Sequence, residues 1–405
     1  METNKPNIEN NQMENFQILY SNFDKLQMAF KANFLKEHLD LLEETKKKAQ
    51  ETHEKELIFL NGVPVHVDEK GMQRYKYSFK TEEENIYFVN DSNKEDAYNL
   101  IIAISSKSFM LYGYSESIAR IKRNLQIWGV EIKKEALSRV DFCVDFLVPD
   151  NFEIEPNNFI RHQNTSLHTY GKTAKIAEEP AEQDDTYIAY YGGKIETCTV
   201  GKMPNKQITI YNKTNEIKKR KKNEWYDVWK VKEGSRVFRV EIRAGKDYLK
   251  DYWNMRSFKD LEEMAGDMFL KLTQTIRYTQ QATEKRDYKA LHPIWAMVRE
   301  QLQNVFSYSV NGLDNNKLKE VKREEKINLL NKHLEGLGTT LAFFTNASAE
   351  KVNQLRNFIQ RVFFNNTNGA YDYQERAFKA KVERAFNHHA KKYYFLNPQP
   401  QMQLI

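Results

Sequence analysis

The stretch Arg139-Val-Asp-Phe-Cys-Val-Asp-Phe146 alternates polar and apolar residues along its whole length. Because successive side chains of a β-strand point to opposite faces, this period of two predicts a strand with one apolar and one charged face. Valine and phenylalanine, which favour strands, form the apolar face. Arg139, Asp141 and Asp145 share the other face. We therefore predict a half-buried strand that presents an arginine and two carboxylates.

The same design returns later as Arg236-Val-Phe-Arg-Val-Glu-Ile-Arg243, where Glu241 lies on the polar face. Asp141 and Asp145 lie about 13 Å apart along their strand, whereas residues opposite each other on neighbouring strands have Cβ atoms only ~5 Å apart. One aspartate could therefore meet Glu241 across strands and hold a hard divalent cation through carboxylate oxygens. The alternative is a solvated surface on which the arginines of both strands neutralise the acids.

Composition sets broad limits on the protein. Its 405 residues, 40% hydrophobic and 29% charged, suffice for one large domain with appendages or for two domains. A net charge of +6 gives only weak support for a polyanionic partner. Cys143 and Cys198 lack metal-ligand spacing, which predicts buried thiols in a reducing compartment. The sequence has no signal-type N-terminus and no apolar run long enough to span a membrane. We therefore expect a soluble cytoplasmic protein that does not contact membranes.

Periodicity divides the chain into three predicted regions. In residues 1–56, a disordered start precedes an amphipathic helix from about residue 13, because apolar residues recur every three or four positions. Residues 57–283 hold short strands, a Gly192-Gly193 turn and a helical end, which predicts an α+β catalytic domain. Residues 284–405 are helical in pattern and are expected to bind DNA or to dimerise. The predicted fold is α+β: a central, largely antiparallel sheet with flanking helices, an N-terminal helix and a helical C-terminal extension.

Nucleotide-binding motifs are absent from the sequence. Gly192-Gly193-Lys194 resembles the end of a phosphate loop, but Ile188 stands where the first glycine belongs, and no Gly-x-Gly-x-x-Gly occurs. The sequence therefore gives no sign of an ATPase or a nicotinamide enzyme.

Tyr211 ends a predicted strand, residues 207–211, on its polar side. Lys213 follows, and then a basic run of Lys218, Lys219, Arg220, Lys221 and Lys222. A tyrosine beside cations suits nucleophilic attack on a phosphodiester, because cations favour the phenolate and a metal would polarise the phosphate. The simpler interpretation is a tyrosine that packs its ring at a strand end beside a solvated basic surface.

Four motifs occur in a recognisable order. They are Arg-Val-Asp-x-x-x-Asp at 139–145, Tyr-x-x-Tyr-Tyr-Gly-Gly at 187–193, Ile-Tyr-Asn-Lys-x-x-Glu at 210–216 and Phe-Arg-Val-Glu-Ile-Arg at 238–243. Their order and spacing, over roughly residues 58–275, resemble the Rep_trans family of plasmid rolling-circle replication initiators and related relaxases of integrative elements. The N-terminal helix and the long C-terminal region depart from that pattern.

The resemblance implies metal-dependent, sequence-specific DNA nicking and joining through a 5′-phosphotyrosine intermediate. It makes Tyr211 the nucleophile, with Tyr190 or Tyr191 as alternatives, and gives Lys213 a supporting catalytic role. Asp141 and Glu241, with Asp145 as a third acid, would hold Mg²⁺ or Mn²⁺. The implied phosphate-binding residues are Arg139, Arg239, Arg243, Lys213 and the basic run 218–222.

The implied partners are DNA, as a double-stranded origin and a single-stranded nick site, a host helicase, a polymerase and a second copy in a homodimer. Because the chain has no phosphate loop, strand separation would need the helicase. Two alternatives stay open: a conjugative or mobilisation relaxase with the same chemistry, and a non-catalytic DNA-binding replication regulator.

Overall fold

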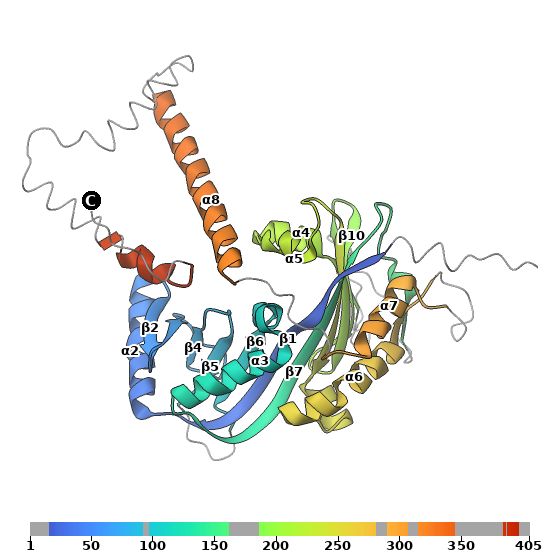
Figure 1. Ribbon diagram of the computed structural model, residues 1–405, viewed down its shortest axis with the longest axis horizontal. Helices are drawn as coiled ribbons and strands as arrows, with labels where there is room; N and C mark the ends of the chain where they lie inside the picture. The colour runs from blue at the N-terminus through green and yellow to red at the C-terminus, as the bar shows by residue number, and fades with distance from the viewer. Residues whose placement is uncertain are drawn as a thin grey trace, which may run out of the picture. The chain divides into compact units, whose positions relative to one another are not determined.

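The computed structural model describes residues 16–91, 97–161, 186–280, 290–306, 315–344, 384–385 and 387–396 (Figure 1). The chain divides into two compact units. One comprises Met1–Glu54 and Ile58–Leu313, and the other Lys55–Leu57 and Asp314–Ile405. The candidate site lies wholly in the first unit.

Eleven strands form one sheet in the order β2-β3-β4-β5-β6-β1-β7-β12-β11-β10-β9. They are β1 (Gln17–Asn33), β2 (Glu56–Leu60), β3 (Val63–Val67), β4 (Tyr77–Lys80), β5 (Ile86–Val89), β6 (Leu100–Ser105), β7 (Glu131–Leu147), β9 (Thr186–Tyr191), β10 (Lys194–Lys202), β11 (Lys206–Asn212) and β12 (Val237–Gly245). From β3 to β9 every neighbouring pair is antiparallel. β8 (Phe159–Arg161) and β13 (Ile276–Tyr278) form a separate two-stranded sheet. The predicted α+β class with a largely antiparallel sheet is confirmed.

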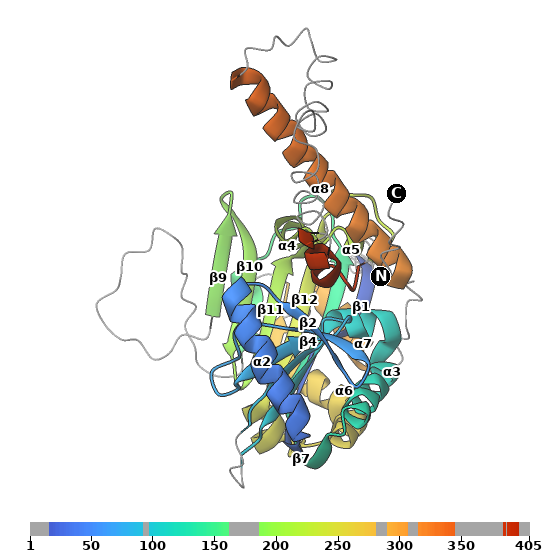
Figure 2. The same ribbon diagram turned by 90° about the vertical axis from the view of Figure 1, so that its left-hand side faces the viewer.

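The helices of the first unit lie on the faces of this sheet. They are α2 (Lys36–Thr52), α3 (Ser106–Ile127), α4 (Lys213–Arg220), α5 (Glu224–Trp229), α6 (Phe258–Thr275) and α7 (Pro293–Leu302), with a 3₁₀ turn at Pro156–Asn158 and a π-turn, η2, at Tyr248–Tyr252. Figure 1 shows α6 and α7 on one side of strands β9 to β12 and α4 and α5 on the other. Strand β9 ends the sheet, as Figure 2 shows from the side.

The apolar face of β7 anchors the core, as the sequence predicted. Phe142 is fully buried and packs on Phe269 of α6, with ring centroids 5.8 Å apart. Its neighbour on β1, Phe23, lies 5.5 Å from Phe142 and 5.7 Å from Phe109 of α3. Such aromatic contacts bury large apolar areas. One continuous core therefore joins both halves of the sheet.

The predicted N-terminal helix is wrong over its first half. Residues 17–33 form β1, a central strand of the sheet, and only Lys36–Thr52 is helical. Two β-bulges explain the error, because Leu19 and Asp24 are extra residues of β1 without a partner in the β7 register. Each inserted residue lengthens the apolar spacing from two to three, so that Phe23 and Leu26 recur with a helix-like period.

The second unit contains α8 (Asn315–Phe344) and a short helical stretch at 384–392 in which residue 386 is not described. This agrees with the helical pattern expected for the C-terminal region, although residues 345–383 lie outside the described residues. The α7 helix, which the sequence grouped with that region, belongs to the first unit. None of the helices in the described ranges is both long and apolar enough to cross a membrane.

We expect Phe142→Ala to lower the free energy of unfolding by about 3–5 kcal/mol, because it leaves a cavity between β7 and α6. Urea denaturation followed by circular dichroism would measure the loss. Ile132→Ala is the matched control, since Ile132 lies on the same strand but is 38% exposed. It should cost much less, and equal losses from both variants would contradict this placement of the core.

Candidate functional site

Three rows of side chains cross the sheet on the face that carries α4 and α5. Antiparallel register places them side by side, because residues opposite each other on neighbouring strands point to the same face. From β11 through β12 and β7 to β1, the rows are Tyr211–Arg239–Asp145–Tyr20, Thr209–Glu241–Cys143–Asn22 and Gln207–Arg243–Asp141–Lys25. The two acid-bearing strands are thus direct neighbours, and Glu241 lies diagonal to both aspartates.

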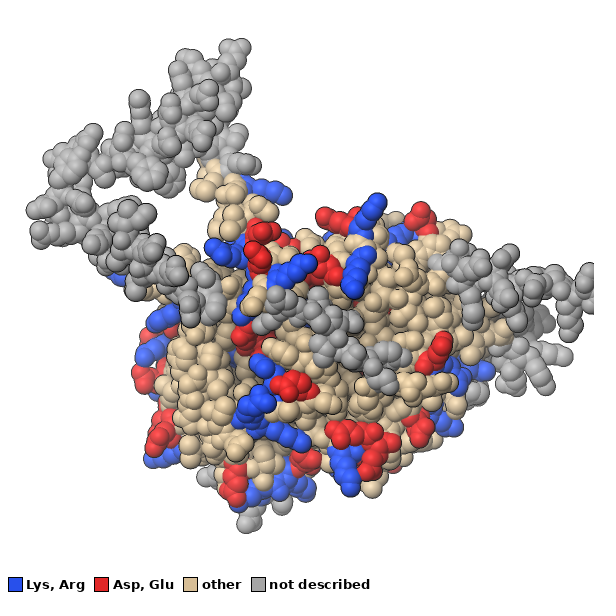
Figure 3. Space-filling model, viewed as in Figure 1, with Lys and Arg blue, Asp and Glu red and all other residues tan. Residues whose placement is uncertain are grey.

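A pocket of about 740 Å³ opens over these rows. Its cationic lining is Lys25, Arg139, Lys213, Arg220, Lys222 and Arg243, and its acidic lining is Asp24, Glu216 and Glu241. Tyr187 and Tyr211 complete the aromatic lining. In the view of Figure 3, basic and acidic side chains are interspersed over the surface, whereas the pocket lining holds six cationic side chains and three acidic ones. A concave site with such an excess attracts anions.

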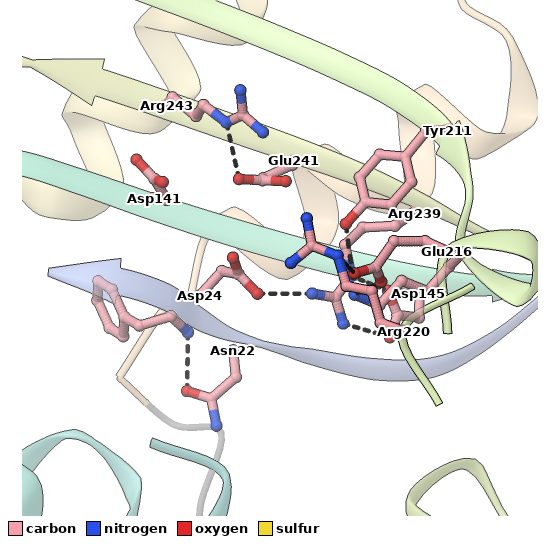
Figure 4. Close-up of polar contacts among 12 residues, drawn as sticks. Asn22, Asp24, Asp141, Asp145, Tyr211, Glu216, Arg220, Arg239, Glu241 and Arg243 are labelled. Atoms are coloured by element: carbon pink, nitrogen blue, oxygen red, sulfur yellow. Dashed lines mark hydrogen bonds and ion pairs between the residues drawn. The ribbon is translucent and has the colours of Figure 1, made fainter. Parts of the chain in front are cut away.

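Asp145 and Arg239 form a buried ion pair beneath this pocket. Arg239 Nε donates to Asp145 Oδ1 at 2.5 Å and Nη2 to Oδ2 at 2.8 Å (Figure 4). Trp229 Nε1 also donates to Asp145 Oδ2, at 2.8 Å. Both side chains are buried. Asp145 was predicted as a third metal ligand and Arg239 as a phosphate-binding residue. Both stay predictions, although in this structure the two groups are engaged with each other.

Asp24 is a site residue that the sequence reasoning missed. It is the bulged residue of β1, and its Oδ1 accepts a hydrogen bond from Arg239 Nη1 at 2.5 Å. Burial opposes its ionisation, but Arg239 and Lys213 outweigh burial and lower the pKa of Asp24. A bulge redirects a side chain. The only signal in the sequence is the polar pair Asp24-Lys25, which interrupts the alternation of β1.

Asp141 and Glu241 are each held by an arginine of their own strand. Arg139 Nε donates to Asp141 Oδ1 at 2.8 Å and Nη2 to Oδ2 at 2.6 Å, while Arg243 Nε donates to Glu241 Oε1 at 2.7 Å. Burial raises the pKa of Asp141 to about 7, opposed by its hydrogen bonds to Arg139 and reinforced by the nearby charge of Glu241. The structure thus shows the salt-bridged arrangement that was the alternative to a metal site.

This donor set does not fit Mg²⁺ or Mn²⁺ as it stands. Mg²⁺ prefers octahedral coordination by oxygen atoms, which are here engaged by guanidinium groups. Among the residues that the structure describes, no group of three or more His, Cys, Asp or Glu side chains could hold a metal ion. The divalent cation stays a prediction from the sequence.

Tyr211 and Lys213 meet at the entrance of α4. Asn212 caps this helix by accepting a hydrogen bond from the Asn215 amide at 3.0 Å, which turns the chain back over the sheet. Lys213 Nζ then lies 3.5 Å from Tyr211 Oη and 2.6 Å from Glu216 Oε2. Burial raises the pKa of Tyr211 well above its ordinary value and lowers the pKa of Lys213, with Arg239 adding to the latter shift. Tyr211 is therefore a neutral phenol at neutral pH, with a lysine and a carboxylate in line.

The basic run forms the last residues of α4 and the turn after it. Arg220 and Lys222 line the pocket. Lys219 turns elsewhere: its Nζ lies 2.8 Å from Glu196 Oε1 and 4.6 Å from the ring centroid of Tyr191. Lys218 and Lys221 are exposed, and neither is part of the pocket lining. The alternative nucleophiles Tyr190 and Tyr191 lie on β9, also outside that lining. Cys143 and Cys198 are buried free thiols, as predicted.

Removing Arg239 should leave Asp145 charged and unpaired in the core. We expect Arg239→Met to lower the free energy of unfolding by about 3–5 kcal/mol, and the double variant Arg239→Met/Asp145→Leu to lose less than this single variant. Urea denaturation of both singles and the double completes the cycle. Strictly additive losses would contradict the ion pair.

Protonation of Asp141 should release Arg139 for an anion. Since the pKa of Asp141 is about 7, the carboxylate is charged above this pH and neutral below it. We expect affinity for a heparin oligosaccharide, whose sulfates keep their charge, to rise as the pH falls from 8 to 6 at fixed salt. Titration calorimetry should show a smaller rise for Asp141→Asn, and an identical pH dependence in both proteins would contradict this role.

No family model and no curated protein matches the chain. Among solved structures, a rolling circle replication initiator protein from Geobacillus stearothermophilus matches at a TM-score of 0.38 and 11% sequence identity, covering 72% of this chain and 98% of that chain. A likeness of this degree does not by itself establish a common function.

Proposed function

We propose that this protein nicks and rejoins DNA at the pocket over β7, β11 and β12, with Tyr211 as the nucleophile, and that it initiates rolling-circle replication. The observation that carries the proposal is that Tyr211 lines a cavity together with six cationic side chains. A phosphodiester is the anionic group that such a tyrosine can attack.

Two further cations of the pocket lining, Lys25 and Lys222, could contact the phosphate. Burial lowers the pKa of Lys25, with the neighbouring Arg139 contributing, and Asp141 and Asp24 only partly oppose this shift. A bound phosphate would oppose it further, because it adds negative charge beside the lysine. Positioned cations of this kind also stabilise the charge that develops as a phosphoryl group transfers.

The proposed step is a transesterification. Tyr211 Oη attacks phosphorus and forms a new O–P bond, while the bond from phosphorus to the 3′ oxygen breaks. The products are a 5′-phosphotyrosine and a 3′-hydroxyl, and the reverse reaction rejoins the strand. Lys213 Nζ gives a proton to Glu216 Oε2, 2.6 Å away, and the resulting amine takes the phenol proton from Tyr211 Oη, 3.5 Å away. The departing 3′ oxygen takes up a proton from solvent.

A relaxase for conjugative or mobilisation transfer would use the same step, and the pocket residues are equally suited to it. A non-catalytic DNA-binding regulator is favoured by one observation, the raised pKa of Tyr211, because a neutral phenol is a poor nucleophile. This candidate needs the cationic pocket but neither Tyr211 nor Lys213.

We expect the wild-type protein to form a covalent adduct with 3′-labelled or internally labelled single-stranded DNA tiled from the replicon that carries its gene. Denaturing gels would detect the adduct on the fragment downstream of the nick. Tyr211→Phe should abolish it because the hydroxyl is lost, and Lys213→Met should slow it by about 100-fold or more. Parallel reactions with Mg²⁺, Mn²⁺ or a chelator would test the expected cation.

Tyr187→Phe is the matched control, since Tyr187 lines the same pocket and should keep the adduct. An adduct that persists in Tyr211→Phe but disappears in Tyr190→Phe or Tyr191→Phe would move the nucleophile to β9. Binding without any adduct, unchanged in Tyr211→Phe, would instead establish the regulator.

A further inference from the structure

Strand β9 carries an exposed aromatic surface that the proposed chemistry does not use. Three of its six residues are tyrosines, and Tyr187, Tyr190 and Tyr191 are 56%, 46% and 61% exposed. Because β9 is the last strand of the sheet, no other described strand covers its outer edge. Exposed rings at the mouth of a cationic pocket call for an explanation, since tyrosine normally buries most of its ring.

The register separates these tyrosines between the two faces of the sheet. Tyr187 lies opposite Thr199 of β10, which lies opposite Thr209 of β11, so Tyr187 belongs to the row of Glu241 on the pocket face. Tyr191 is four residues further on and points to the same side, whereas Tyr190 points to the other. The contact of Lys219 from α4 with the Tyr191 ring, at 4.6 Å, agrees with this assignment.

The two tyrosine rings on the pocket face lie where a nucleic-acid strand bound in the pocket could extend. Tyr187 is part of the pocket lining, and β9 lies two strands from β11, or about 10 Å from its backbone. Tyr191 lies about 13 Å further along β9, so a segment of a few nucleotides can reach both rings. Lys219 beside Tyr191 adds positive charge along this path, although Glu196 partly neutralises it.

We propose that Tyr187 and Tyr191 form a stacking platform for the unpaired bases of single-stranded nucleic acid whose phosphate enters the pocket. The proposal rests on the proposed function for the site of the phosphate and extends it to the form of the substrate. Stacking requires an aromatic face and tolerates any base, because every base has a π-face. Bases paired within a duplex cannot reach the rings, so the platform selects single strands.

The test is fluorescence anisotropy of a labelled 20-nucleotide oligo-dT and of a duplex of equal length, at 0.15 M salt. We expect Tyr187→Ala and Tyr191→Ala each to weaken oligo-dT binding by about 5- to 150-fold, the range for losing one stacked base. Tyr187→Phe and Tyr191→Phe should stay within about twofold of wild type, because phenylalanine keeps the ring. Duplex binding should change little in all four variants.

Tyr190→Ala is the matched control, because this tyrosine lies on the same strand and is similarly exposed but points to the opposite face. Equal weakening by Tyr190→Ala and Tyr187→Ala would overturn the platform, as would loss of binding in the phenylalanine variants. If the alanine variants instead lose self-association and keep oligo-dT affinity, the edge of β9 pairs with another strand and the platform is overturned.

The adduct assay separates this proposal from the proposed function. An adduct formed by wild type together with unchanged oligo-dT affinity in Tyr187→Ala and Tyr191→Ala would overturn the platform alone. Weakened affinity in these variants together with no adduct in any protein would overturn the nicking chemistry and support the platform as a binding site.

Discussion

The buried ion pair between Arg239 and Asp145 is the constraint on which the rest of the site depends. A guanidinium and a carboxylate in a sheet interior are tolerated only when their hydrogen bonds are satisfied. Here Trp229 from α5 and Asp24 from β1 complete the set. One arginine therefore ties together β1, β7, β12 and the helix that covers them. The pocket above this network has a fixed floor, which a site for ordered chemistry requires.

The bulge at Asp24 shows how an irregular strand serves the site. Phe23 lies opposite Phe142 and Lys25 opposite Asp141, so Asp24 stands between them without a partner on β7, and its carboxylate reaches Arg239. The local loss of ladder pairing is offset by the ion pair that the redirected carboxylate forms. Together with the bulge at Leu19, that at Asp24 gave residues 13–33 their misleading helical period. The bulge at Asp24 thus contributed both to an error of prediction and to a contact within the site.

The acidic side chains of the pocket are paired with arginines, whereas the sequence suggested that they bind a metal ion. Asp141 and Glu241 do approach each other across β7 and β12, and their repulsion contributes to the raised pKa of Asp141. Each is nevertheless neutralised by an arginine two residues away on its own strand. Such pairs lie on the same face of one strand, because side chains repeat with a period of two. The cationic lysines Lys25 and Lys222 then remain for an anion.

Alternation with a period of two is a local property, so the α+β class, the strands at 139–146 and 236–243 and the polar side of Tyr211 could be predicted from the residues alone. The central strand at 17–33 could not, because a bulge is defined by the partner strand and not by the chain that contains it. Register likewise decided the partners of each charge. Register places Arg239 opposite Asp145, and it puts Tyr187 on the pocket face and Tyr190 on the other face. It also brings Asp24 next to site residues that are more than a hundred positions away in the chain.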